Sequence, residues 1–360
     1  MKCFIFGAGA TANCDIANPD RRPPMARTAD FLRIVEKPLN GTLASSDYAE
    51  RFLNPFCVWA FQRFDNLEYL FTLLFMLSLE DSFENIEAKL RGKYTDESWL
   101  DDAVLVADKL QFAIVPRNII TDLIGLVRDE IQLCLGTMGP YPSRYEFQPL
   151  SIQHRQLVRA LKPGDAVVSF NWDTVVDYAL LNERLLNEAS FQNPSFSTIR
   201  IPDDCKMEGP SVFLLKPHGS FNWFSTLPAG LESAKIGVFF GKLYEGTDFM
   251  TSPPVILPYL YKEPILQQLP VFKKEIALTY LALADCDELV VIGKQFMTGD
   301  ADLADSIKQS CEYRQRRVVY VNPQVKDSAW VKHHNAVFNA TNTDQPKRLF
   351  NDINSYINLL

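Results

Sequence analysis

The sequence lacks cysteine pairs. Its seven cysteines are scattered singly, without a C-x-x-C pair, and are Cys3, Cys14, Cys57, Cys134, Cys205, Cys286 and Cys311. A disulfide framework or a structural zinc site uses cysteines in pairs, and an odd total leaves at least one thiol over. We therefore predict buried free thiols in a reducing cytosol, and no metal site.

Long apolar runs and an excess of basic residues are missing too. The longest apolar run, Tyr69–Leu79, is far shorter than the roughly 20 residues that span a bilayer. The chain also enters its first expected strand too early to leave room for a signal peptide. The formal net charge of -8 argues against a surface that neutralises nucleic-acid phosphates. We expect a cytoplasmic protein that binds neither membranes nor, directly, nucleic acids.

What the sequence does have is apolar residues arranged as strands and helices in alternation. It has 360 residues, 47% of them hydrophobic, enough for the core of one large domain or two modest ones. Short apolar runs predict strands at residues 2–6, 165–170, 212–215, 236–240, 288–292 and 318–321, and helices are expected at 151–161, 272–284 and 302–315. This alternation predicts an α/β fold with a doubly wound, Rossmann-like parallel sheet.

A long helical segment interrupts this pattern. Residues 31–161 contain mostly helical periodicity, as in Ile120, Leu123, Ile124, Val127 and Ile131. The aromatic residues there are interpreted as core rather than as a base-stacking surface. We therefore predict one α/β domain over residues 1–360 that carries a helical insertion module at 41–150.

Two of the predicted strands end abruptly in polar side chains. Asn171 and Asp173 follow the strand at 165–170, and His218 follows the strand at 212–215. Open α/β sheets bind their ligands at the carboxyl ends of the strands, so an amide, a carboxylate and an imidazole there predict a functional site. The alternative is that Asn171 and Asp173 cap a helix that begins near Thr174, since both residue types are favoured caps.

The first strand leads directly into a glycine-rich turn. Residues 7–12 read G-A-G-A-T-A, the G-x-G-x-x-A pattern of a dinucleotide-binding turn, in which backbone N–H groups approach a pyrophosphate. A purely structural glycine turn is the alternative. Prolines at 19, 23 and 24 break any following helix, which argues against an ordinary hydride-transferring dehydrogenase. Gly293 and Asn322 follow two further predicted strands, so the same sheet edge is expected to carry them as well.

The remaining histidines are interpreted as ordinary residues. His154 lies in the predicted helix at 151–161 without an evident partner, and Ser151 is expected to cap that helix. His333 and His334 are adjacent in sequence and would point to different faces of a helix or a strand, so they do not predict a metal site.

Taken together, these strand ends resemble the sirtuin family, specifically the sirtuin-like domains of bacterial antiphage defence proteins. Gly7-Ala8-Gly9 is similar to the family's phosphate turn, with Thr11 where a serine is usual. The run S-F-N-W-D at 169–173 resembles its N-x-D motif, and H-G-S-F-N-W at 218–223 resembles its histidine motif. Gly293 and Asn322-Pro323 are similar to its adenosine-side positions, and the resemblance spans residues 2–17, 165–224 and 254–323.

The sequence also departs from the family pattern. Asp15 and Ala17 stand where sirtuins have glycine and proline, which implies a differently built loop over the nicotinamide ribose. Lys294 and Gln295 replace small hydroxyl residues, which puts the adenine-ribose contacts in doubt. The zinc-binding cysteine pairs of the deacylases are missing, and the helical insertion is foreign to them.

The resemblance implies an NAD glycohydrolase with NAD as its substrate and no metal. In this hypothesis His218 is the general base, since an imidazole titrates near working pH, and Asn171 positions the attacking water or the ribose hydroxyls. Asp173 accepts the carboxamide N–H of nicotinamide. The pyrophosphate would be bound by Gly7, Ala8, Gly9 and Thr11, and the adenosine side by Gly293 and Asn322.

The resemblance further implies a role in antiphage defence by NAD depletion. Since unrestrained depletion is toxic, we expect a homo-oligomer or a partner that restrains it, such as a HerA-type ATP-driven DNA translocase beside which relatives of similar length act. One alternative is a catalytically silent module that binds NAD or ADP-ribose as a sensor or scaffold. Protein deacylation ranks lower because the zinc module is absent.

Overall fold

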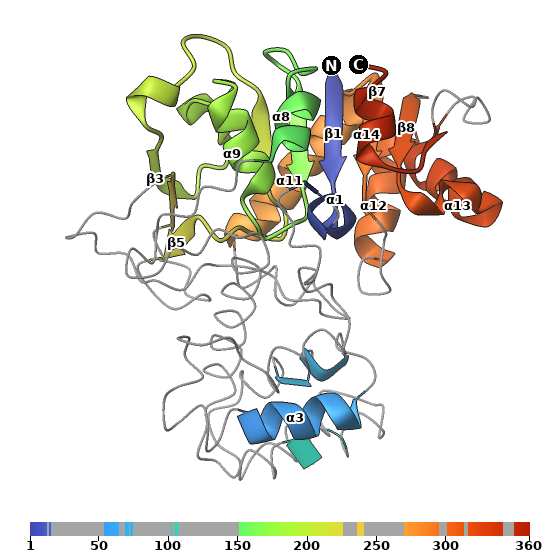
Figure 1. Ribbon diagram of the computed structural model, residues 1–360. Coiled ribbons are helices and arrows are strands. Elements are labelled where there is room, and N and C mark those ends of the chain that lie inside the picture. Colours follow the sequence, from blue (N-terminus) through green and yellow to red (C-terminus); the bar gives the residue numbers. More distant parts are fainter. Residues whose placement is uncertain are drawn as a thin grey trace. The chain divides into compact units, whose positions relative to one another are not determined.

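A computed structural model describes most of the α/β part of the chain and a little of the rest (Figure 1). The described residues are 1–12, 14–15, 54–64, 69–71, 73–74, 102, 105–106, 151–225, 236–240, 270–294, 301–312, 316–340 and 349–360. The chain divides into two compact units. One comprises residues 1–23, 132–255 and 263–360, and the other comprises residues 24–131 and 256–262.

The first unit is built on a parallel sheet. Its six described strands lie in the order β4-β2-β1-β7-β8-β9, and every neighbouring pair is parallel. They are β1 (Lys2–Phe6), β2 (Ala166–Ser169), β4 (Phe213–Leu215), β7 (Glu288–Ile292), β8 (Arg317–Val321) and β9 (Leu349–Phe350). The predicted α/β fold with a doubly wound parallel sheet is confirmed.

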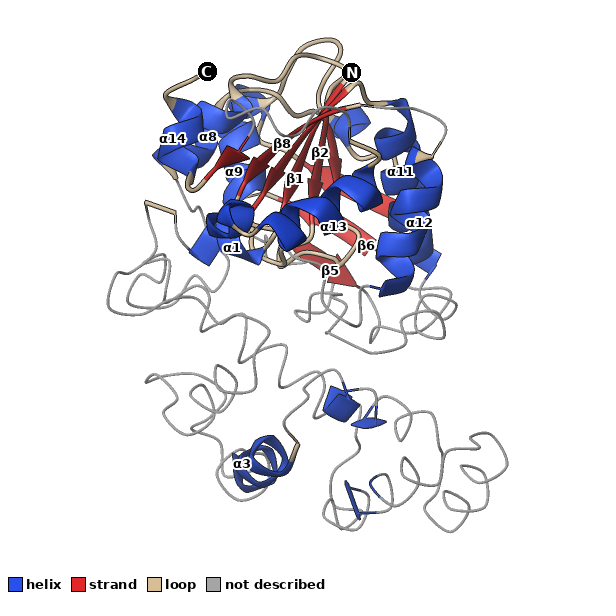
Figure 2. Ribbon diagram, turned by 90° about the vertical axis from the view of Figure 1, so that its right-hand side faces the viewer, coloured by secondary structure: helices blue, strands red, loops and turns tan. Residues whose placement is uncertain are grey.

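Helices cover both faces of this sheet, as Figure 2 shows. On one face, α11 (Pro270–Asp285), α12 (Ala301–Cys311) and α13 (Ser328–Phe338) contribute to a core that includes Cys3 and Ile5 of β1. On the other face lie α8 (Ile152–Val158), α9 (Val175–Asn182) and α14 (Ile353–Ile357), and the Phe6 ring stacks on His154 of α8. Because side chains alternate along a strand, burial on both faces requires the continuous apolar runs that the sequence contains.

The helix boundaries follow from local sequence signals. Ser151 caps α8, and its hydroxyl accepts a hydrogen bond from the His154 backbone N–H at 3.2 Å, as predicted. Helix α11 begins at Pro270, where a missing N–H costs no helical hydrogen bond. Of the helix predicted at 302–315, residues 313–315 lie outside the described residues.

The same unit contains a second, smaller sheet, and Phe240, directly after one of its strands, contacts Tyr178 of α9. It has the strand order β3-β6-β5 within the described residues, with β3 (Phe196–Arg200), β5 (Trp223–Ser225) and β6 (Ile236–Phe239). The sequence predicted β6 but neither β3 nor β5. Packing of the Phe196 ring against Trp223, with 4.9 Å between centroids, joins residues that no local pattern connects.

Only short stretches of the second unit are described. Helix α3 (Asn54–Arg63) carries buried Phe56, and buried Phe64 follows it, which agrees with aromatic residues that form core. Most of the predicted helical module at 41–150, including the helix expected around Ile120, lies outside the described residues, so the module stays a prediction. No helix among the described residues is long and apolar enough to cross a membrane.

Candidate functional site

The sheet order defines where a ligand crevice should lie. From β1 the chain builds outward through β2 and β4, and it then returns to the other side of β1 to form β7 and β8. The reversal occurs between β1 and β7, and ligands of open α/β sheets bind at the carboxyl ends of the strands at this point. Gly7 follows β1 and Gly293 follows β7, so both glycines lie at the reversal.

The two glycines are required because the backbones meet there. Gly293 has φ +59°, and a Cβ on it would lie 2.2 Å from the Ala10 nitrogen and 2.5 Å from the Gly9 carbonyl carbon. A Cβ on Gly7 would lie 2.4 Å from the Lys294 Cα. These are backbone contacts that no rotamer change relieves, so only glycine fits. The glycine pattern therefore has a structural cause in addition to the predicted role in binding.

The N–H groups of the turn are partly engaged within the protein. Gly7 donates to the Ile292 carbonyl at 2.9 Å, Gly9 donates to Gly293 at 3.0 Å, and Ala10 donates to Gly7 at 2.9 Å. Ala8, the first residue of α1 (Ala8–Ala12), is exposed. A pyrophosphate would therefore need donors other than these three N–H groups, and binding by residues 7–11 stays a prediction.

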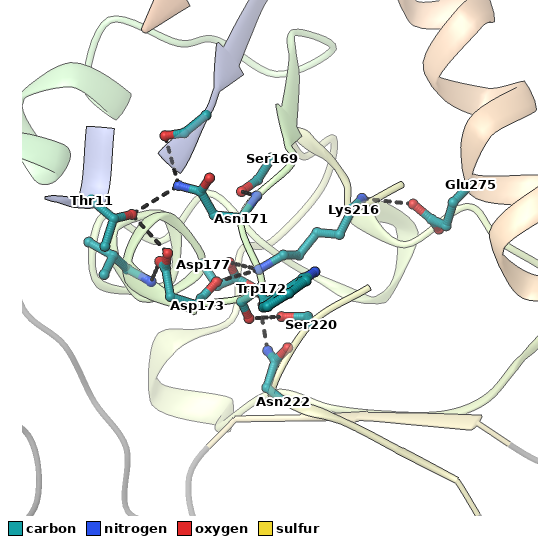
Figure 3. Close-up of polar contacts among 12 residues, drawn as sticks. Thr11, Ser169, Asn171, Trp172, Asp173, Asp177, Lys216, Ser220, Asn222 and Glu275 are labelled. Carbon is teal, nitrogen blue, oxygen red and sulfur yellow. Dashed lines mark hydrogen bonds and ion pairs between the residues drawn. The ribbon is translucent and has the colours of Figure 1, made fainter. Parts of the chain in front are cut away.

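Asn171, Thr11 and Asp173 form one hydrogen-bonded group (Figure 3). The Asn171 amide nitrogen donates to the Gly7 carbonyl at 3.0 Å and to the Thr11 hydroxyl at 2.9 Å. The Thr11 hydroxyl donates its one proton to Asp173 at 2.8 Å, so it can only accept from Asn171. Both Asn171 amide protons are thus engaged, and its carbonyl oxygen is the group that a ligand can use.

Both carboxylate oxygens of Asp173 accept hydrogen bonds from the protein. One carboxylate oxygen accepts from Thr11, and the other accepts from the Val175 backbone N–H at 3.0 Å, in the first turn of α9. Asp173 therefore satisfies an N–H of the first turn of α9, as the structural alternative expected, and its role in binding stays a prediction. Burial raises the pKa of Asp173, whereas the nearby Lys216 ammonium and these hydrogen bonds act in the opposite direction.

His218 lies against the residue that precedes Asn171. Its half-buried ring meets the Phe170 ring edge to face, with 5.2 Å between centroids. The buried Lys294 ammonium also approaches this phenyl ring, at 4.3 Å from its centroid. The structure thus brings residues of four strand ends around one edge of the sheet: those after β1, β2, β4 and β7.

Asn322 follows β8 at the same edge. Its side-chain oxygen accepts from the Gln324 N–H at 2.9 Å and so caps the short helix Pro323–Lys326, and its own N–H donates to Phe350 at 2.9 Å. A local structural role therefore accounts for this residue, and the predicted contact with adenosine stays a prediction.

Sequence reasoning missed a set of buried charged residues behind the site. Lys216, Asp177 and Glu275 are each at most 1% exposed. The Lys216 ammonium forms an ion pair with Asp177 at 2.9 Å, and its backbone N–H donates to Glu275 at 2.8 Å. Burial raises the pKa of Glu275 to about 7. The available signal was a single charged residue inside an otherwise apolar run, as in V-V-D-Y-A-L-L at 175–181.

His154 has partners that the sequence did not reveal. Its Nδ1 lies 2.9 Å from the Ser151 hydroxyl, and burial lowers its pKa to about 4. Asp15 accepts from the Ser151 hydroxyl and, at 2.8 Å, from the Ile152 N–H. Asp15 thus satisfies an N–H in the first turn of α8. Ala17 lies outside the described residues, so the differently built loop stays a prediction.

Among the residues that the structure describes, no three His, Cys, Asp or Glu side chains gather as a metal site would require. Within the same residues, five of the cysteines are free thiols: Cys3, Cys14, Cys205, Cys286 and Cys311. Burial raises the pKa of Cys286 to about 12, which makes it a poor nucleophile.

No protein-family model and no curated protein matches this chain. One solved structure that matches is described as "Structural Basis for the Mechanism and Regulation of Sir2 Enzymes". The two chains share 11% sequence identity with a TM-score of 0.32, over 65% of this chain and 75% of that one. A similarity of this size carries no conclusion about cofactor or reaction.

Proposed function

We propose that this chain binds NAD and hydrolyses its nicotinamide–ribose bond. The observation that supports this most is the group formed by Asn171, Thr11 and Asp173 at the strand reversal, where open α/β sheets bind dinucleotides. Its free acceptor is the Asn171 carbonyl oxygen. An acceptor of this kind can orient a water molecule or a ribose hydroxyl, both of which present O–H donors.

The proposed reaction needs little from the protein beyond orientation and one base. The oxygen of water bonds to C1′ of the ribose as the bond from C1′ to nicotinamide breaks, and nicotinamide leaves as a neutral molecule. The proton of the attacking water passes to His218, whose ring lies against the phenyl ring of Phe170. The transition state resembles the oxocarbenium ion of glycoside cleavage, and a water-poor pocket favours it.

Chromatography of an NAD incubation tests this activity directly. We expect equal amounts of nicotinamide and ADP-ribose, and a loss of about a hundredfold or more in Asn171→Ala and in His218→Ala. The exposed His333 of α13 offers a matched control, since His333→Ala removes an imidazole away from the sheet edge. Unchanged nicotinamide release from folded Asn171→Ala or His218→Ala would refute the assigned roles.

A second candidate is a catalytically silent module that binds NAD or ADP-ribose. Both amide protons of Asn171 and both carboxylate oxygens of Asp173 already form hydrogen bonds with protein groups. Such a network is typical of a structural role, and this observation favours the silent module. Isothermal titration together with product analysis separates the two functions. Tight nucleotide binding without product would identify the silent module.

The cellular role is proposed on the same basis. We propose that NAD depletion serves antiphage defence and that oligomerisation or a HerA-type translocase restrains it in the resting cell. Coexpression followed by pull-down and by an NAD assay tests the partner. The absence of any complex, together with a monomer that hydrolyses NAD freely, would contradict this restraint.

A further inference from the structure

One buried ammonium group connects the segment that leads to His218 with the motif at 169–173. Lys216 follows β4, and its Nζ donates to the Asp173 carbonyl at 2.6 Å and to the Asp177 carboxylate at 2.9 Å. Both side chains of the Lys216–Asp177 ion pair are 1% exposed. The ion pair therefore joins three separate pieces: the end of β4, the turn after β2 and the first turns of α9 (Figure 3).

Further hydrogen bonds connect the same pieces. The Phe221 N–H donates to the Trp172 carbonyl at 2.8 Å, and the Asn222 amide donates to the second Asp177 oxygen at 3.4 Å. Two successive carbonyls, those of Trp172 and Asp173, thus accept hydrogen bonds from the segment 216–222, which contains His218. The segment that carries Asn171 and the segment that carries His218 are thereby aligned.

The backbone of Lys216 is fixed from the opposite side as well. Glu275 of α11 accepts the Lys216 N–H at 2.8 Å and the Asn193 amide at 3.1 Å. Lys216 is therefore anchored at its main chain by one carboxylate and at its ammonium by another. His218 follows two residues later, and its ring lies against Phe170.

Stability alone does not explain this arrangement. Removing two charges from water costs several kcal/mol per ion, and a buried ion pair replaced by apolar residues of similar volume is often as stable or more so. What the charges do supply here is selectivity, because an ammonium group has three donors and no acceptor and so can be buried only against groups that accept hydrogen bonds.

We propose that the Lys216–Asp177 ion pair is a positioning device that sets His218 relative to Asn171 and Asp173. This inference rests on the proposed NAD hydrolysis, in which these three residues act on one substrate. Lys216 itself contacts no reacting atom, so its role is orientation. Without the ion pair the protein still folds and binds NAD, but His218 leaves its place against Phe170.

The test is the double variant Lys216→Met/Asp177→Leu, which removes both charges and retains most of the volume. We expect cooperative unfolding, a kcat for NAD hydrolysis lowered at least tenfold, and a KM changed less than about threefold. The milder variant Asp177→Asn should also lower kcat. It replaces the double variant in this test if the double variant does not fold. Lys206→Met is the control, since it breaks an exposed ion pair with Glu188 in the same unit.

A second measurement does not depend on activity. The chain has 4 histidines, and the His218 ring resonance, assigned with His218→Gln, should shift when the ring leaves Phe170, whereas those of His154, His333 and His334 should not. If wild type releases no nicotinamide, the proposed function fails and this resonance alone decides the inference. An unchanged kcat or an unchanged His218 resonance in the folded variants would overturn it.

Discussion

The Thr11 hydroxyl donates a 2.8 Å hydrogen bond to the Asp173 carboxylate across 162 residues of sequence. It thereby joins the turn after β1 to the turn after β2, and it simultaneously accepts from Asn171 at 2.9 Å. One hydroxyl is thus both the donor that a buried carboxylate needs and the acceptor that orients the amide.

Thr11→Val should therefore destabilise the fold. Valine has nearly the same shape, but it leaves one Asp173 carboxylate oxygen and one Asn171 amide proton without a partner. We therefore expect a cost of about 1–3 kcal/mol in the free energy of unfolding. Thr11→Ser keeps the hydroxyl and should cost less than Thr11→Val. Urea unfolding of the three proteins measures the difference, and equal costs for valine and serine would show that the hydroxyl contributes nothing.

Gly293→Ala should be far more damaging than Gly164→Ala. Both residues have positive φ, +59° and +88°, but a Cβ on Gly293 would lie 2.2 Å from the Ala10 nitrogen, and one on Gly164 meets nothing within 4 Å. Gly164→Ala should therefore cost only the backbone strain, about 1–2 kcal/mol. Gly293→Ala must also separate β7 from the turn after β1. Similar melting temperatures for the two variants would contradict the backbone contact at the strand reversal.

Glu275 should make stability fall as pH rises towards neutrality. Burial raises its pKa from 4.5 to about 7, so between these values the folded protein keeps a proton that the unfolded chain has released. The stabilising contribution of Glu275 is fully present below about pH 4.5, decreases between about pH 4.5 and pH 7, and is lost above about pH 7. The total change in the free energy of unfolding is about 3 kcal/mol.

Glu275→Gln lacks this titration. Urea unfolding of both proteins at several values between pH 5 and pH 8 isolates the contribution as their difference, since all other groups are shared. A difference that does not change with pH would show that Glu275 is ionised throughout. Glu275→Gln can also lower the free energy of unfolding by the same amount at every pH. The reason is that the NH2 group of Gln would face either the Lys216 N–H or the Asn193 amide, and both of these are donors.

His154 should act in the opposite direction at lower pH. Burial lowers its pKa from 6.5 to about 4, so in acid the unfolded chain binds a proton that the folded protein excludes. Its contribution is present above about pH 6.5 and is lost as pH falls towards about 4, again by about 3 kcal/mol. His154→Gln should flatten this acid limb, and exposed His333→Gln should not. Parallel acid limbs in wild type and His154→Gln would disprove the assignment.

The strands could be predicted because their cause is local. Glu288–Ile292 was expected and found with the same bounds, since a parallel strand covered on both faces must be a continuous apolar run. The polar ends of β2 and β4 were visible for the same reason, because a break in an apolar run marks the end of a strand. Strands β3 and β5 escaped prediction because packing between distant aromatic residues, such as Phe196 and Trp223, stabilises them.

The sequence by itself determined the α/β class, the parallel strands and which residue types stand at their carboxyl ends. Only the tertiary structure decided that Gly293 meets the turn after β1, that Thr11 joins Asn171 to Asp173, and that Lys216 pairs with Asp177. The physical reason is that periodicity records the burial of each residue, whereas a hydrogen bond or an ion pair depends on which strand ends become neighbours. The strand order supplies that information, and no local pattern encodes it.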